Sequence, residues 1–326
     1  MPLSEFSIIA QYFTRPSRRD DVVVGVGDDA ALLEIPPQMQ LAVSVDALVA
    51  GRHFPLETSP DAIGYKALAV NLSNMAAMGA NPAWVTLALT LPEANADFVA
   101  AFAAGFYRLA EAYGIELVGG DTVRGPLQAV VQIHGLVPRG KALTRAGARD
   151  GDHLFVTGTL GDAGAGLRLV QGQLSCEDKC AGELRRRLDY PSPRVRAGLS
   201  LRDIASAAID ISDGLLADLG HILDASSVGV EIELDAIPVS AALKGCLSDS
   251  VDRLRLSLTA GDDYELCFTV PEEKLAELQR VAADWDCSVT RIGRIRSGSG
   301  IGVCNGELPS DLIAGFDHFG GGDGNQ

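Results

Sequence analysis

Apolar residues along the chain recur either at every second position or at the spacing of a helix, and the two kinds of segment alternate. Runs rich in Val, Leu and Ile predict strands. These runs cover residues 22–27, 41–45, 84–91, 115–120, 127–137, 153–158, 207–211, 230–234, 255–259 and 265–270. Helical spacing predicts helices at residues 4–13, 61–78, 97–113, 194–208, 214–226 and 272–283. The pattern therefore predicts a chain of the α/β or α+β class.

Turn residues set the expected ends of the first long helices. Asp97 is a suitable N-cap for the helix that follows it, and Gly114 is a suitable stop for the same helix. Gly79 is expected to end the helix over residues 61–78 in the same way.

A polar, turn-rich segment at residues 138–152 separates two halves that each contain strands and helices. The chain of 326 residues is long enough for two domains of ordinary size. We therefore expect an N-terminal domain over residues 1–140 and a C-terminal domain over residues 141–318. The glycine-rich end, residues 319–326, is expected to be a disordered tail.

Composition excludes some classes of function. The formal net charge is −16, whereas a nucleic-acid-binding protein normally has a basic face, so no nucleic-acid partner is expected. Asn, Gly and Pro residues interrupt the charge-free stretch at residues 67–92, so no membrane span is expected. The N-terminus lacks the pattern of a signal peptide, and the six cysteines form no CxxC pair. Reduced thiols in a cytoplasmic protein are the expected state.

Aspartates stand where several predicted strands end. They are Asp28, Asp29, Asp46, Asp121, Asp210, Asp213, Asp262 and Asp263. Each one alone is a common turn residue, although loops at strand ends are also where sites are usually built. If these ends converge, the like charges need a counter-charge, which Mg²⁺ would supply while also binding substrate phosphates. The pattern suggests phosphoryl transfer from a nucleotide and leaves scattered turn residues open as the alternative.

Three glycine-rich segments suggest other nucleotide sites. GVGDDA at residues 25–30, with Asp46 beyond it, resembles the dinucleotide fingerprint of a dehydrogenase, but its two aspartates would repel a pyrophosphate. GLVPRGKA at residues 135–142 has the frame of a phosphate loop without the hydroxyl residue that holds magnesium. GTLGDAGAG at residues 158–166 is either a phosphate cradle or a tight turn from strand to helix.

A series of motifs occurs in the order found in a known family. The chain contains, in order, GVGDDAALL, SVDALVAGRHF, YKALAVNLSNMAAMGA, GGDT, ALTRAGA, IDISDGL, GDDYELCFT and GFDHF. This set resembles bacterial thiamine-monophosphate kinase, a family in the superfamily of aminoimidazole ribonucleotide synthetase and selenophosphate synthetase. The resemblance extends from Glu5 to Phe319, and the GRHF and FDHF segments distinguish the kinase from other superfamily members.

The resemblance implies a two-domain fold like that of aminoimidazole ribonucleotide synthetase. The N-terminal α/β domain would form a homodimer, the C-terminal domain would be an α+β layer, and the active site would lie in the cleft between them. Two or more Mg²⁺ ions would be bound, ATP would be the co-substrate, and thiamine monophosphate would be the acceptor.

The resemblance also implies residue roles. Asp28, Asp121 and Asp213 would be catalytic. The metal ligands would be Asp28, Ser44, Val45 through its backbone, Asp46, Asn74, Asp121, Asp210 and Asp213. ATP would contact Tyr113, Gly120, Asp121, Arg145 and Ser212. Thiamine monophosphate would contact His53, Asp262 and Phe316.

Three of these positions depart from the family pattern. Asn74 stands where the family usually has a metal-binding aspartate, Val45 replaces a usual threonine, and Asp262 replaces a usual glutamate. An asparagine can still bind Mg²⁺ through its amide oxygen, but it brings no charge. We therefore expect a weaker or more hydrated metal site rather than an inactive enzyme.

The expected chemistry needs no general base. The acceptor is a phosphate oxygen whose second pKa is about 6, so it is mostly deprotonated at neutral pH. Direct in-line transfer between the two phosphates is expected, with Mg²⁺ offsetting their repulsion. Three alternatives stay open: another ATP-using member of the superfamily, a non-catalytic protein that binds metal and nucleotide, and a nicotinamide-dependent dehydrogenase.

Overall fold

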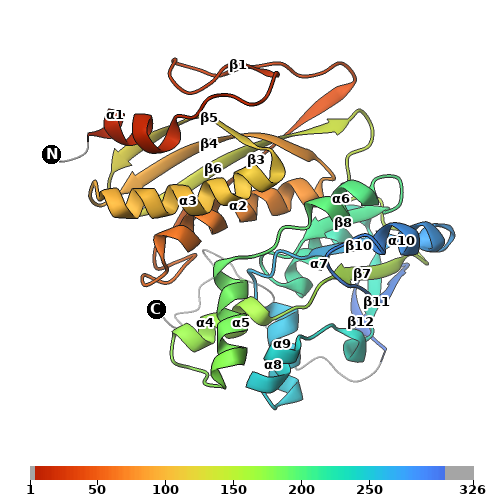
Figure 1. The fold of residues 1–326 in the computed structure, drawn as a ribbon. Helices are drawn as coiled ribbons and strands as arrows, with labels where there is room; N and C mark the ends of the chain where they lie inside the picture. The colour runs from red at the N-terminus through yellow and green to blue at the C-terminus, as the bar shows by residue number, and fades with distance from the viewer. Residues whose placement is uncertain (1–3, 305–326) are drawn as a thin grey trace. The chain divides into compact units, whose positions relative to one another are not determined.

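The computed structural model describes residues 4–304 and divides the chain into two compact units. Within the described residues, the first unit runs to Ala142 and also contains Asp189–Leu199, whereas the second contains Leu143–Leu188 and residues 200–304. Each unit has its own β-sheet with helices packed on it (Figure 1). The mixture of helices and strands predicted from the alternating pattern is confirmed. Phe316 and the expected tail at residues 319–326 lie outside the described residues.

The first unit is built on a four-stranded sheet in the order β3-β6-β4-β5. Its strands are β3 (Met39–Val49), β4 (Asn81–Leu91), β5 (Glu116–Arg124) and β6 (Gln128–Pro138). β6 pairs antiparallel with both β3 and β4, whereas β4 and β5 are parallel. Parallel neighbours need a crossover, and a helix between β4 and β5 in the sequence provides it.

Helices α2 (Pro60–Ala77) and α3 (Ala96–Tyr113) lie side by side on one face of this sheet (Figure 1). They approach closely because Gly64 and Gly105 lie at their contact, where a Cβ would collide with a backbone carbonyl of the other helix. The expected N-cap of α3 is wrong by two positions. Asn95 caps the helix by accepting from the amides of Asp97 and Phe98, which places Asp97 in the first turn.

The other face of the sheet is only partly covered. Strands β1 (Val22–Val24) and β2 (Leu32–Leu33) form a small antiparallel ladder, whose residues pack with Trp84. Further along β3, the side chains of Val43 and Val45 remain 52% and 57% exposed. The predicted helix at the N-terminus is also present, as α1 (Glu5–Ile8) continued by the π-helix Ile9–Phe13.

The second unit contains a six-stranded sheet in the order β12-β9-β11-β7-β10-β8. Its strands are β7 (His153–Thr157), β8 (Ala207–Asp210), β9 (Gly229–Ile232), β10 (Leu266–Val270), β11 (Val289–Arg296) and β12 (Gly300–Val303). All neighbours are antiparallel except β12 and β9. β11 and β12 were not predicted, because three arginines interrupt the apolar residues of β11, and β12 is only four residues long with two glycines.

Further helices and short turns occur in this part of the chain. They are α4 (Asp162–Val170), α5 (Asp178–Asp189), α6 (Val195–Leu201), α7 (Leu215–Ser226), α8 (Ala241–Cys246), α9 (Ser250–Thr259) and α10 (Leu275–Ala282), with 3₁₀ turns at Leu234–Ala236 and Glu272–Lys274. By contact, α6 belongs largely to the first unit. The helix expected over residues 194–208 is too long, since Asp203 adopts a left-handed φ of 64° and the next apolar residues enter β8.

The predicted strand at residues 255–259 is wrong, because this segment is the end of helix α9. Asp249 caps the helix by accepting from the amides of Val251 and Asp252. Leu256 packs into one core cluster and Leu258 into another. Two cores on different sides of one helix produce an alternation of leucines that resembles the period of a strand.

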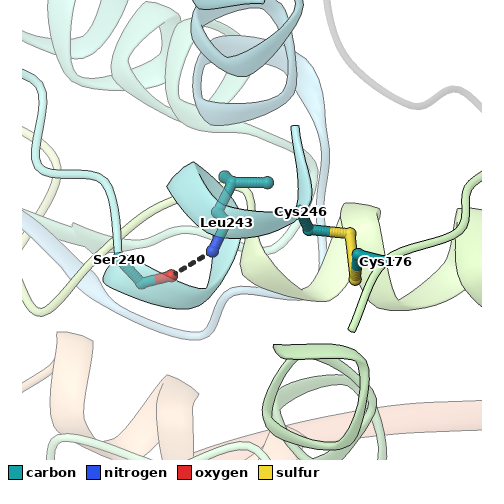
Figure 2. Close-up of a disulfide and its surroundings, with 4 residues drawn as sticks. All are labelled: Cys176, Ser240, Leu243 and Cys246. Carbon is teal, nitrogen blue, oxygen red and sulfur yellow. Dashed lines mark hydrogen bonds between the residues drawn. A yellow bond between two sulfur atoms is a disulfide. The ribbon is translucent and has the colours of Figure 1, made fainter. Parts of the chain in front are cut away.

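Cys176 and Cys246 form a disulfide, so the expectation that all cysteines are reduced is wrong for this pair. Figure 2 shows that the bond ties the C-terminal end of α8 to the segment before α5, while Ser240 caps the other end of α8 by accepting from the Leu243 amide at 3.0 Å. The two cysteines are 70 positions apart, and sequence spacing alone does not reveal such a pairing.

Across residues 4–304, every helix is too short or too polar to cross a membrane.

Candidate functional site

Three turns of the second unit meet at one edge of its sheet. β7 and β8 both pair antiparallel with β10, so they run in the same direction and end where β10 begins. The turns at this edge cover residues 158–161, 211–214 and 261–265. All three carry motifs that the sequence connects with phosphoryl transfer.

Backbone hydrogen bonds join two of these turns. The Ile211 amide donates to the Glu265 carbonyl at 2.8 Å, and the Tyr264 amide donates to the Ile211 carbonyl at 2.8 Å. The Asp262 amide donates to the carbonyl of Ser212 at 2.9 Å. The structure thus brings together the predicted site residues of this edge, which are Asp210, Ser212, Asp213 and Asp262.

The turn at residues 211–214 is held by an acid that the sequence analysis did not single out. Oδ2 of Asp218 accepts hydrogen bonds from the amides of Ser212, Asp213 and Gly214 at 2.9, 3.0 and 3.2 Å. Burial raises the pKa of Asp218 to about 7, and the charges of Asp210 and Asp213 act in the same direction. An acid four positions beyond a helix-starting glycine is the sequence signal that could have revealed it.

Asp262 is held in an unusual conformation. Its φ is 68° and that of Tyr264 is 50°, and both values lie in the left-handed region that most residues avoid. The Tyr264 hydroxyl donates to Oδ1 of Asp262 at 2.9 Å. The carboxylate expected to meet the substrate is therefore oriented by a tyrosine two residues away.

Asp263, between these two residues, points into the protein rather than toward solvent. Its Oδ2 accepts from the Gly161 amide at 2.8 Å, at the start of α4. Burial raises the pKa of Asp263 well above its usual value, which favours the neutral acid. Asp263 was noted in the sequence as a strand-end acid, and the structure places it among the buried polar residues.

More acids surround the glycine-rich turn at residues 158–166. Arg187 lies 3.2 Å from Glu265 and 3.6 Å from Asp162, and both acids are buried. Thr157 donates to Glu265 at 2.7 Å. The Gly161 amide thus already donates to a carboxylate, and the acids around the turn would repel a phosphate. This arrangement favours a tight turn over a phosphate-binding loop.

Arg145 is exposed on the segment that precedes β7. Its carbonyl accepts from the Ser226 hydroxyl at 3.2 Å, and the same hydroxyl accepts from the amides of Gly147 and Ala148. The backbone around Arg145 is therefore fixed to the end of α7.

In the first unit, the structure brings Asp46 and Asn74 together. Asn74 on α2 donates through Nδ2 to Oδ2 of Asp46 on β3 at 2.6 Å. Ser44 and Asp46 lie on the same face of β3, because side chains two apart on a strand share a face. Val45 points to the opposite face, so a metal contact from this residue would come from its backbone carbonyl.

Asp121 and Asp28 are exposed acids of the same unit. Asp121 accepts from the Thr122 amide at 2.8 Å, and Asp28 accepts from the Asp29 amide at 2.9 Å. Gly120 precedes Asp121 with a φ of 149°, and a Cβ there would collide with the Leu87 carbonyl. Only glycine fits this close approach of β5 to β4.

His53 lies in the turn that follows β3. Its Nδ1 accepts from the Val49 amide at 3.0 Å, which assigns the ring proton of the neutral form to Nε2. The buried Lys66 donates to the His53 carbonyl at 3.3 Å. Tyr113, at the end of α3, donates through its hydroxyl to the Pro193 carbonyl at 3.1 Å.

The predicted metal ligands are divided between the two units. Within residues 4–304, no group of three or more His, Cys, Asp or Glu side chains is placed to hold a metal ion. The donors themselves are oxygens of carboxylates, a hydroxyl, an amide and a backbone carbonyl. That donor chemistry fits Mg²⁺, which binds few protein ligands and leaves positions for phosphate oxygens.

Comparison with known proteins assigns the class. The family description "AIR synthase related protein, N-terminal domain" matches residues 27–137, and "AIR synthase related protein, C-terminal domain" matches residues 149–304. The chain therefore belongs to the AIR synthase related family, as its two α/β units and their acidic turns indicate. The predicted fold is confirmed.

Relatives with high sequence identity show to which group of this family the chain belongs. The thiamine-monophosphate kinases of Salmonella typhimurium and Escherichia coli (strain K12) are each 48% identical to this chain over 98% of its length and 99% of theirs. Within the family, the chain is thus a member of the thiamine-monophosphate kinases, and the resemblance carried by its motifs is confirmed.

Solved structures agree with this placement. The crystal structure of thiamine-monophosphate kinase from Stenotrophomonas maltophilia matches with a TM-score of 0.83 at 50% identity, covering 88% of this chain and 92% of that one. The structure described as AaThiL complexed with AMPPCP and TMP matches with a TM-score of 0.78 at 34% identity, covering 90% and 92%.

Proposed function

We propose that this protein is an ATP-dependent kinase that phosphorylates thiamine monophosphate to thiamine diphosphate. The observation that carries the proposal is identity of 48% to thiamine-monophosphate kinases over almost the full length of both chains. A structural neighbour, AaThiL, has been described in complex with AMPPCP and TMP, an ATP analogue together with the proposed acceptor. The acid-bearing turns of both units supply the residue chemistry that this reaction needs.

The reaction joins two anionic phosphates, so the protein must reduce their repulsion and align them. The acceptor oxygen is already mostly deprotonated at neutral pH, and no general base is required. The attacking oxygen of thiamine monophosphate forms a bond to the γ-phosphorus of ATP, and the bond from that phosphorus to the bridging oxygen of ADP breaks. Direct in-line transfer leaves no phosphorylated residue on the enzyme.

Magnesium is part of the proposal. Asp28, Ser44, Asp46, Asn74 and Asp121 of the first unit would hold it, with the Val45 carbonyl, and Asp210 and Asp213 of the second unit would do so too. Bound there, two or more Mg²⁺ ions would offset phosphate charge, which is the chemistry that kinases generally draw from this metal. The oxygen-only donor set supports this assignment.

ATP and thiamine monophosphate would contact separate residues. We assign Tyr113, Gly120, Asp121, Arg145 and Ser212 to ATP. The exposed guanidinium of Arg145 suits a phosphate. His53, Asp262 and Phe316 are assigned to thiamine monophosphate, because its thiazolium cation favours an acid and an aromatic ring.

We also propose that the protein is a homodimer. One sheet face of the first unit leaves apolar side chains of β3 exposed, and a second copy of the chain would cover them. Light scattering should give twice the chain mass for the wild type. Val43→Glu should shift the protein toward the monomer, whereas Val251→Glu, a matched change at an exposed position of the second unit, should not. A monomeric wild type would refute the dimer.

ATP as the phosphoryl donor supports a cytoplasmic location. In such a reducing compartment the Cys176–Cys246 bond would be subject to reduction, and labelling of thiols in freshly lysed cells measures its state.

One assay tests the main proposal. Purified protein is incubated with ATP, Mg²⁺ and thiamine monophosphate, and thiamine diphosphate is measured by chromatography. Product should form only when all three are present, and a metal chelator should abolish it. Absence of product at millimolar Mg²⁺, or turnover of aminoimidazole ribonucleotide synthetase substrates instead, would overturn the assignment.

Acid quenching tests the direct transfer. After incubation with γ-labelled ATP, the denatured protein should retain no stoichiometric label. Retention of one label per chain would replace direct transfer by a phosphoenzyme route.

A further inference from the structure

Two helices of the second unit start at glycines that cannot cap them. Gly161 begins α4 with a φ of 87°, and Gly214 begins α7 with a φ of 115°. Neither glycine has a side chain that accepts from the first helical amides, as a serine or aspartate N-cap would. At position 214 a Cβ would lie 2.8 Å from the Thr259 backbone, so packing excludes an ordinary capping residue.

Asp218, in the first turn of α7, forms hydrogen bonds to the turn that precedes the helix. Its own amide donates to the Gly214 carbonyl at 3.0 Å, and its carboxylate accepts from the Gly214 amide at 3.2 Å. The same oxygen accepts from the amides of Ser212 and Asp213. These two amides belong to the turn before the helix, so the carboxylate satisfies the turn and not the first helical amides.

A carboxylate at this position is repelled by neighbouring charges, and a purely structural role would not require a charged group. Asp218 is 3% exposed and lies near the charges of Asp210 and Asp213. A neutral Asn or Ser would avoid that repulsion. One carboxylate oxygen accepts from all three amides, and these bonds fix the backbone dihedrals of residues 212–214.

We infer that Asp218 is a positioning residue for phosphoryl transfer: it fixes the 212–214 turn so that Ser212 and Asp213 are presented in one conformation to the nucleotide and its metal. The inference rests on the proposed kinase function. Residues that orient primary ligands typically change activity or metal affinity by about tenfold to a hundredfold when they are lost. Asp218 itself contacts neither substrate.

The test compares Asp218→Asn with Asp224→Asn, an exposed acid on the same helix. Asp218→Asn should lower kcat by about tenfold to a hundredfold and raise the Mg²⁺ concentration for half-maximal rate. Rates are measured well below the melting temperature of each variant. Asp224→Asn should match the wild type in both quantities.

A second readout does not depend on activity. Hydrogen exchange at the amides of residues 212–214 should be about tenfold faster or more in Asp218→Asn, while exchange in the rest of α7 stays unchanged. Accelerated exchange throughout the second unit would show a role in stability alone and overturn the inference.

The kinetic outcomes separate the two proposals. If wild-type protein forms no thiamine diphosphate, the proposed function fails. If wild type is active and Asp218→Asn has the same kcat and Mg²⁺ dependence, only the positioning role is overturned. A lower melting temperature with unchanged kinetics would overturn it as well.

Discussion

The acids of the two units differ in what surrounds them. In the first unit, Asp28 and Asp121 are exposed, and each accepts a hydrogen bond from the amide of its next residue. In the second unit, Asp218 and Asp263 are buried, and each accepts from backbone amides of a turn that precedes a helix. The same residue type beside a strand end is suited to bind a metal ion in one setting and to support the backbone in the other.

Exposure accounts for this difference. A buried carboxylate whose oxygen accepts from backbone amides, as in Asp218, has little capacity left for a ligand. An exposed carboxylate keeps its remaining lone pairs for water or a cation. The comparison therefore predicts that substitution of an exposed acid assigned to the metal reduces activity with little change in stability, and that the effects of substituting Asp218 or Asp263 run through the backbone that each one holds.

Asp121→Asn should produce the largest effect. Loss of a charged ligand from the electrostatic machinery should lower kcat by about a hundredfold or more. The melting temperature should be unchanged, because Asp121 is exposed. Asp97→Asn, another exposed acid of the same unit, is the matched control and should keep full activity. Wild-type turnover by the folded Asp121→Asn variant would contradict the assignment of exposed acids such as Asp121 as metal ligands.

Phe316→Ala extends the comparison to a residue beyond those the structure describes. An aromatic ring against a cation contributes on the order of 1 kcal/mol, so KM for thiamine monophosphate should rise roughly fivefold to tenfold. KM for ATP should change much less. Equal increases in both KM values would assign Phe316 to support of the fold instead of substrate binding.

Asn74→Asp, in the first unit, should have a smaller effect than the preceding substitutions, and it should improve metal binding rather than impair function. The substitution adds a charged ligand, so the Mg²⁺ concentration for half-maximal rate should fall severalfold while kcat stays nearly constant. Without metal, two carboxylates would meet where Asn74 now donates to Asp46 at 2.6 Å, and the melting temperature in chelator should drop.

Asn81→Asp, at an exposed position of β4, serves as the control for the added charge. It should alter neither the titration nor the melting temperature in chelator. If the Asn74→Asp and wild-type Mg²⁺ titrations overlap, Asn74 does not belong to the metal site.

Asp263→Asn should have the smallest effect on activity, and its effect on stability should depend on pH. The folded-state pKa of Asp263 lies above the unfolded value, so the native state binds more protons and wild-type stability falls as pH rises above about 4. The variant lacks this loss. Its melting temperature should therefore improve relative to wild type as the pH rises above about 4.

Chemical denaturation at several pH values gives the same comparison as a free energy of unfolding. A difference between Asp263→Asn and wild type that stays constant over this range would mean that Asp263 is ionised in the folded protein. The contrast between exposed and buried acids would then need a different explanation.

Much of the fold follows from local patterns. The helices over residues 61–78 and 97–113 and the strands over residues 84–91 and 153–158 were predicted within a few residues, because each has one apolar face or is apolar throughout. The strand predicted at residues 255–259 was wrong because the leucines of this helical segment pack into two different cores. The Cys176–Cys246 bond was missed because its partners are brought together only by folding.

The candidate site, too, was predicted in part from the sequence and in part only revealed by the structure. Motif order identified the family and the acids that could act, including Asp121 and Asp213. It gave no sign that Asp218 holds the turn before α7 or that Arg187 lies between two buried acids. These roles depend on hydrogen bonds between segments that folding places side by side.

The sequence by itself determined the α/β class, the family and which residues carry carboxylates, since periodicity and motif order are local properties of the chain. Tertiary structure alone decided which carboxylates serve as scaffold. Burial and hydrogen-bond partners come from packing between distant segments, as when the Asp263 side chain reaches the Gly161 amide across 102 positions of sequence. An aspartate has the same chemistry at every strand end, and its surroundings set whether it supports the backbone or faces a ligand.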